Sequence, residues 1–140
     1  MTTPGGILLV LALMLPFTGV LAALVAGGRT AGRIALALLP AGLAIATAIV
    51  LKVLQTGEAL TYLLGDWSPP LGVTLRVDGL AAAMLLTTAI IVCAIGLFAR
   101  ADFATPPGTA EARGPFAFWM LLLAVWGALN TVFMAGDLFT

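Results

Sequence analysis

The sequence predicts an all-α membrane protein with four transmembrane helices and a short external β-hairpin between the second and third helices. Of the 140 residues, 62% are hydrophobic and only 9% are charged, whereas about a quarter of a soluble domain is charged. Four uncharged runs approach the roughly 20 residues that cross a hydrocarbon core. Between the second and third runs, residues 65–79 gather charges and prolines that do not fit in lipid. We expect residues 1–140 to form a single membrane segment.

The first span is predicted at about residues 5–27, and the chain carries no charge before Arg29. A cleaved signal peptide is the alternative interpretation, but such a peptide has Lys or Arg before its apolar segment. Here Arg29 and Arg33 follow the apolar segment. Pro16 lies in the middle of the span and is expected to kink the helix.

The second span is predicted at about residues 34–54. Lys52 falls near its end, where a long aliphatic stem lets the ammonium reach the headgroups. Residues 28–33 are expected to form a tight turn, because a connection this short makes the first two helices antiparallel neighbours. Gly42 and Ala46 give the second helix a small-residue face for close packing.

The third and fourth spans are predicted at about residues 79–99 and 115–136. They are separated by a polar loop with Pro106-Pro107-Gly108 at its centre, which is typical of a chain break. Four residues, 137–140, follow the fourth run.

The hairpin is predicted over residues 60–78. After Gly72 the chain alternates between apolar and polar side chains, which is the pattern of a half-buried strand. The apolar positions are Val73, Leu75 and Val77, and the polar ones are Thr74, Arg76 and Asp78. Leu60–Leu64 supplies a partner strand, and the glycines and prolines between the two supply the turn.

The basic residues predict the orientation. Four lie in the first and third connections, namely Arg29, Arg33, Arg100 and Arg113, and two lie on the hairpin side, Lys52 and Arg76. Because cytoplasmic loops carry the excess of Lys and Arg, we expect the N-terminus and the hairpin to lie outside.

The charge pattern excludes several functions. The net charge is zero, so binding to nucleic acid is not indicated. With no His and with Cys93 as the single cysteine, no metal site, cofactor site or catalytic residue is expected. Lys52 is the most nearly embedded charge and a weak candidate for a proton relay, although an anchor that reaches the headgroups is the favoured interpretation.

Polar and aromatic residues inside the spans have an ordinary explanation and a functional one. Asn130 and Thr131 could line a polar path, but hydrogen bonds between neighbouring helices are the favoured interpretation. Trp119 and Trp126, seven residues apart, are interpreted as a packing stripe rather than a binding cage. Cys93 is interpreted as a small core residue.

Arg76 and Asp78 lie two residues apart and therefore on the same face of the predicted strand. Each could meet a charge on a neighbouring chain. A solvated strand face explains them equally well at this point, so both interpretations stay open.

The order of three motifs resembles a known family. They are Gly65-x-Trp67-x-x-Pro70-x-Gly72, then Val77-Asp-Gly-Leu80 at the start of a helix, and Ala135-Gly-Asp-Leu-Phe139 at the end of another. This order resembles the N-terminal quarter of the antiporter-like subunits of respiratory complex I, Mrp-type cation/proton antiporters and membrane-bound hydrogenases. Within this family, the first and last of these motifs look most like those of the D-type Mrp subunit.

The resemblance implies the N-terminal part of a longer proton-translocating subunit, which works inside a larger complex in a bacterial-type plasma (inner) membrane. The family's proton-carrying Glu and Lys lie beyond the last motif, so none can be placed on this chain. The segment itself would be a scaffold without catalysis. In the family, the outward hairpin contacts the adjacent subunit, which makes Trp67, Arg76 and Asp78 candidate subunit contacts. The implied partners are the lipid bilayer and other membrane subunits.

Several alternatives remain open. The chain could be a fragment, a truncation or one part of a split subunit. A stand-alone accessory protein that stabilises a complex is a second candidate function. A small four-helix exporter is less well supported, because such exporters require a carboxylate in the first span and residues 1–28 have none.

Overall fold

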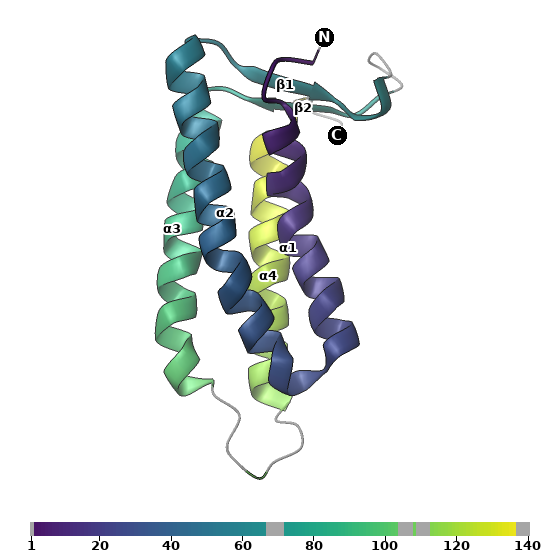
Figure 1. The fold of residues 1–140 in the computed structure, drawn as a ribbon, viewed down its shortest axis with the longest axis vertical. Coiled ribbons are helices and arrows are strands. Elements are labelled where there is room, and N and C mark those ends of the chain that lie inside the picture. The colour runs from purple at the N-terminus through teal and green to yellow at the C-terminus, as the bar shows by residue number, and fades with distance from the viewer. Residues whose placement is uncertain (1, 67–71, 104–107, 109–112, 137–140) are drawn as a thin grey trace.

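The computed structural model describes residues 2–66, 72–103, 108 and 113–136. Within this part of the chain, four helices are long and apolar enough to cross a membrane. They are α1 (Ile7–Ala26), α2 (Gly28–Thr56), α3 (Gly79–Asp102) and α4 (Arg113–Met134). The predicted fold class is confirmed (Figure 1).

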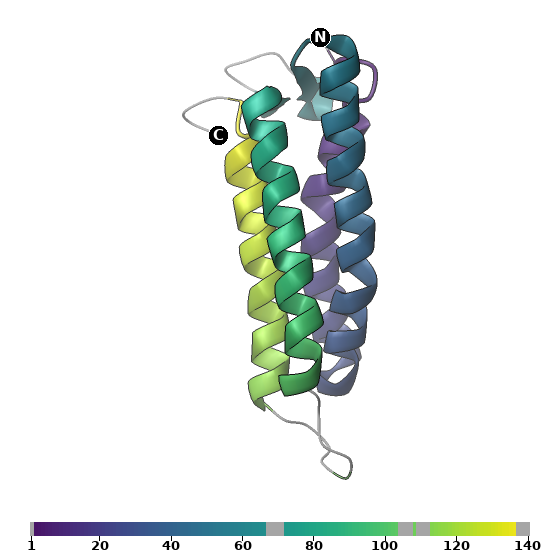
Figure 2. The ribbon, with the colours of Figure 1, turned by 90° about the vertical axis from the view of Figure 1, so that its left-hand side faces the viewer.

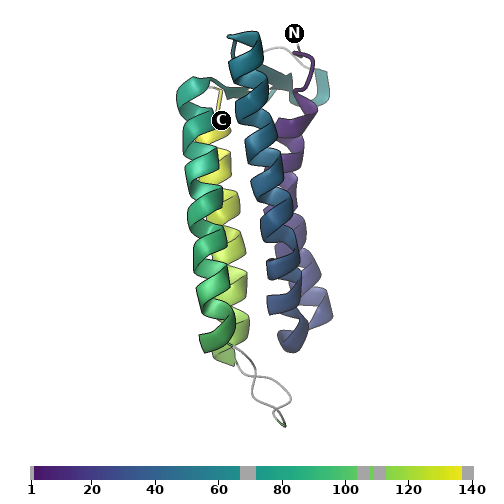
Figure 3. The ribbon, with the colours of Figure 1, turned by 60° about the vertical axis from the view of Figure 1, so that its left-hand side comes forward.

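The helices run alternately down and up, so the N-terminus, the hairpin and the end of α4 lie at one end of the bundle (Figure 1). α2 packs against α1, α3 and α4, and α4 packs against α1 and α3. Views from two other sides show the four helices nearly parallel along the long axis of the molecule (Figures 2 and 3). This arrangement places α2 and α4 in contact through the centre.

The connection between α1 and α2 differs from the prediction. Residues 28–33 were expected to form a turn, but they are the first turns of α2. Gly27 makes the connection alone with φ 84° and ψ 174°, a conformation open to glycine. The prediction was wrong because Ala31, which is fully buried, extends the packed face of α2 ahead of the predicted start of the span. Pro40 consequently lies well inside the helix.

The hairpin consists of β1 (Leu60–Leu63) and β2 (Thr74–Val77), which pair antiparallel with Leu60 opposite Val77. A short 3₁₀ turn at Leu64–Asp66 follows β1. The predicted alternation is confirmed in β2, where Leu75 and Val77 are buried and Arg76 is exposed. The buried side chains join the core beneath the hairpin.

Both outer edges of the hairpin are paired with the chain's own end segments. At β1, the Thr3 amide donates to the Thr61 carbonyl (3.0 Å), and the Thr61 amide donates to Thr3 Oγ1 (2.9 Å). At β2, the Gly136 amide donates to the Thr74 carbonyl (3.0 Å), and Leu75 bridges Ala135. Since an isolated two-stranded hairpin is marginally stable, these contacts hold it on the bundle.

The core is divided into two clusters along the bundle. The cluster at the hairpin end includes Leu9, Ile49, Leu60, Val77, Leu85 and Met134. The cluster toward the other end includes Ala31, Leu39, Val92, Trp119, Leu123 and Trp126. The predicted small-residue face of α2 is confirmed, because a Cβ on Gly42 would collide with the indole of Trp126. Trp119 and Trp126 are both buried and form a packing stripe on α4.

Candidate functional site

Lys52 lies at the hairpin end of α2 and is exposed. Its stem runs beside Gly5, where a Cβ would lie 3.8 Å from Lys52 Cδ. This position is that of a lysine whose charged end reaches the membrane surface. Lys52 does not line the polar centre described below.

Asp78 is exposed and has a local role that the sequence analysis missed. Its Oδ1 accepts a hydrogen bond from the Ala81 amide at 2.8 Å, which caps the N-terminus of α3. An Asp in extended conformation before a helix is a preferred N-cap, because it satisfies one of the four unpaired amides there. The signal was present in the sequence as Asp78 directly before the uncharged run.

Arg76 is exposed at the middle of β2, opposite Thr61 of β1. It projects from the hairpin on the side away from Leu75 and Val77. Of the two candidate contact residues that the structure describes, Arg76 is therefore the one whose side chain is exposed without a capping role. Trp67, the third candidate, lies outside the described residues.

A polar centre, formed by Asn130 and the Ala12 carbonyl, lies between the two core clusters. Its origin is Pro16. A proline inside a helix has no amide hydrogen, so the carbonyl four residues earlier loses its partner. That carbonyl belongs to Ala12, and Asn130 of α4 donates to it through Nδ2 at 3.0 Å. Asn130 is 4% exposed. Among the described residues, it is the one polar or charged residue that is buried. The predicted interhelical role of Asn130 is confirmed.

Two other polar groups inside the spans bond close by. Thr131 Oγ1 donates to the Gly127 carbonyl of its own helix at 2.8 Å. It therefore does not bridge helices in the way predicted for it together with Asn130. Cys93 Sγ donates to the Leu39 carbonyl at 3.4 Å and so links α3 to α2. The Cys93 contact therefore positions two helices, whereas the Thr131 contact stays within α4.

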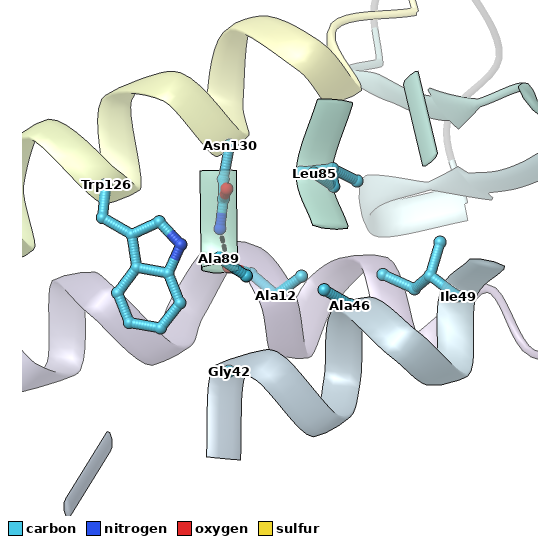
Figure 4. A pocket seen from close by; sticks show the side chains of 8 residues that line it. All are labelled: Ala12, Gly42, Ala46, Ile49, Leu85, Ala89, Trp126 and Asn130. Carbon is cyan, nitrogen blue, oxygen red and sulfur yellow. Dashed lines mark hydrogen bonds between the residues drawn. The ribbon is translucent and has the colours of Figure 1, made fainter. Parts of the chain in front are cut away.

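A small cavity adjoins Asn130 at the junction of the two clusters (Figure 4). A water-sized sphere can move its centre through about 10 Å³ there. The lining residues are Ala12, Gly42, Ala46, Ile49, Leu85, Ala89, Trp126 and Asn130. Among the described residues, neither Trp126 Nε1 nor Asn130 Oδ1 has a hydrogen-bond partner. Leaving such a group unpaired costs about 1–3 kcal/mol.

The sequence reveals only half of this centre. Pro16 within an apolar run indicates a free carbonyl, and Asn130 within another indicates a donor. Their pairing depends on the packing of α1 against α4, because Ala12 and Asn130 are 118 positions apart in the sequence. The position of Trp126, and with it the cavity, depends on the missing side chain of Gly42 on α2.

No protein family and no curated protein matches this chain. Among solved structures, it is similar to a chain in the structure of the membrane-bound sulfane sulfur reductase (MBS), an archaeal respiratory membrane complex, with a TM-score of 0.77 and 21% identity. The similarity covers 94% of this chain and 26% of that chain, so this chain spans about a quarter of its neighbour's length. At this identity the likeness establishes the fold. The four helices and hairpin are therefore a fold also found in a subunit of a respiratory membrane complex.

Proposed function

We propose that this chain is the N-terminal four-helix segment of an antiporter-like membrane subunit and scaffolds a multisubunit respiratory or cation/proton-antiporter complex. The observation that carries the proposal is coverage, since nearly the whole chain matches only 26% of a chain from a respiratory complex. The motifs at residues 65–72 and 135–139 support it independently, through their resemblance to antiporter-like subunits and to the D-type Mrp subunit in particular.

The interior of the bundle favours a scaffold over an ion carrier. An ionisable group at the membrane centre costs about 3 kcal/mol on insertion scales and is retained where it carries ions or protons. Among the described residues, the buried polar or charged side chain is the neutral Asn130. Proton translocation would then belong to the complex rather than to this segment.

The outer surface of the helices suits a partner within the membrane. A third or less of each span is buried inside the chain. The exposed remainder is largely apolar and includes Leu54, Phe98 and Val132, at 74%, 82% and 69% exposure. Such surfaces are covered by lipid or by helices of other subunits.

The hairpin supports a contact at the membrane surface. Its edges are already paired with Thr3 and Gly136, so a partner would engage its exposed side chains. Arg76 is the charge at its centre. We assign Arg76 the main assembly role, with Trp67 and Asp78 as further candidates.

The test is assembly in the native membrane. A tagged chain extracted in mild detergent is expected to migrate on a native gel with other membrane proteins. Arg76→Glu is expected to lower the recovered complex several-fold while the chain still inserts, because reversing a rim charge weakens association and leaves the strand pattern unchanged. If the unmodified chain migrates alone, the proposed function is wrong.

A matched control separates the contact from a general effect of charge. Glu58→Arg changes another exposed charge at the same end of the bundle, outside both strands. It is expected to leave the amount of complex unchanged. If Arg76→Glu also leaves it unchanged while the wild-type chain co-purifies, the scaffold proposal stands and the Arg76 contact fails.

A further inference from the structure

The cavity beside Asn130 is lined by residues of all four helices, and two of them carry complementary polar atoms without a hydrogen-bond partner. Trp126 Nε1 carries a hydrogen to donate, and Asn130 Oδ1 offers lone pairs to accept. The orientation of the Asn130 amide is fixed, because its Nδ2 donates to the Ala12 carbonyl, which can only accept. Figure 4 shows the Trp126 nitrogen turned toward Asn130.

The size of the cavity suits one small occupant. A cavity needs about 10–15 Å³ of space for the centre of a water-sized sphere to hold one water molecule, and this cavity has about 10 Å³. Its other lining side chains are apolar or absent, and it offers no carboxylate to a cation. Trp126 and Asn130 are only 2% and 4% exposed, so bulk water does not reach them.

We propose that this cavity binds a single water molecule, which accepts a hydrogen bond from Trp126 Nε1 and donates one to Asn130 Oδ1. The water completes a row of hydrogen bonds from the Trp126 indole, through Asn130, to the Ala12 carbonyl that Pro16 leaves free. It joins the two core clusters by a polar link in an otherwise apolar interior. This assignment is independent of the proposed function.

The test is nuclear magnetic resonance of the whole chain in lipid nanodiscs, with ¹⁵N-labelled tryptophan. The indole signals of Trp67, Trp119 and Trp126 are assigned with Trp→Phe variants. A cross-peak between water and the Trp126 Hε1 is expected, with the sign of dipolar contact rather than of proton exchange. A wild-type chain without this cross-peak overturns the proposal, and this result depends on no variant.

Two variants test where the water lies. Ala89→Val adds methyl groups to the cavity lining, and Asn130→Leu removes the acceptor at similar volume. In each, the Trp126 indole signal is expected to remain and its water cross-peak to be lost. Ala94→Val, on the exposed side of α3, is the matched control and is expected to keep the cross-peak. A cross-peak that survives both cavity variants places the water elsewhere and contradicts the proposal.

Discussion

Asp78 fixes the start of α3 through one carboxylate oxygen bound to the Ala81 amide. Asp78→Ala is expected to lower the free energy of unfolding by about 1 kcal/mol, because the amide loses its partner. Asp78→Asn keeps a side-chain oxygen and is expected to cost a few tenths of that. Unfolding of the purified chain in micelles, followed by circular dichroism, measures both effects.

Arg76→Ala is the control for Asp78, since it also removes an exposed charge from the hairpin. It is expected to change the stability of the isolated chain by less than about 0.5 kcal/mol. If Asp78→Asn destabilises the chain as much as Asp78→Ala, the charge matters rather than the cap.

The role of a single residue can be predicted from the sequence where a polar side chain falls within an apolar run. Asn130 in an apolar run indicated an interhelical hydrogen bond, and the structure confirms it. The partner of Asn130 could not be predicted, because it is a backbone carbonyl freed by Pro16, 114 positions away (130 − 16). Side-chain patterns along the chain carry no information about which carbonyl faces which helix.

Among the structural elements, the hairpin is held between two glycines that allow close backbone approach. A Cβ on Gly6 would lie 2.8 Å from the Thr61 carbonyl oxygen, and one on Gly136 would lie 2.5 Å from that of Thr74. Both distances are too short for a Cβ. Each end segment can therefore approach its strand because the residue at the contact is a glycine. Gly136 belongs to the motif at residues 135–139, and this contact gives the glycine of that motif a structural reason.

Gly136→Ala is expected to push the end of α4 away from β2 and weaken the hydrogen bond from residue 136 to Thr74. Overpacking of this kind costs about 1–3 kcal/mol, so the amide of residue 136 should exchange with deuterium roughly tenfold faster or more. Hydrogen exchange followed by nuclear magnetic resonance measures the rate.

Gly114→Ala is the matched control, because it lies at the other end of α4 and a Cβ there meets nothing within 4 Å. The exchange rate at residue 136 should stay at its wild-type value in this variant. An unchanged rate in Gly136→Ala would mean that the contact with Thr74 does not depend on the missing side chain.

Helices and strands were predictable where the pattern of apolar residues is strong. The two-residue alternation in residues 73–78 predicted β2, and the uncharged runs predicted the helices. The turn at residues 28–33 was predicted wrongly because two glycines and two arginines there resemble a loop. Burial of Ala31 against the other helices outweighs that local signal.

For the whole molecule, the orientation in the membrane stays a prediction, with the N-terminus and hairpin outside. The structure places Lys52 and Arg76 at the hairpin end, and Arg100 and Arg113 at the other. In a Cys93→Ala background, Glu58→Cys is expected to react with an impermeant maleimide on intact cells, whereas Gly114→Cys is not. Both positions are exposed.

Labelling after the cells are opened is the control, because both cysteines should then react. The reverse pattern on intact cells would invert the orientation. Reaction of both on intact cells would contradict the transmembrane arrangement of the bundle.

The chain alone is expected to conduct no protons, because its described interior holds a neutral polar centre and no buried charge. Liposomes that contain the purified chain and a trapped pH dye should dissipate a proton gradient no faster than empty liposomes, with a potassium shunt present. An added uncoupler confirms that the dye responds. Flux that scales with protein and vanishes in Lys52→Met would make Lys52 a relay residue.

The bond between Asn130 and Ala12 also has a consequence for biosynthesis. The ribosome completes α1 before α4, and the two partners are 118 positions apart in the sequence. Until α4 arrives, the Ala12 carbonyl beside Pro16 has no donor, and an unpaired backbone group in hydrocarbon costs several kcal/mol. α1 is therefore stabilised in the bilayer by α4, a helix made after it, so a ribosome that stalls before Asn130 would release a chain whose α1 is prone to leave the membrane or to be degraded.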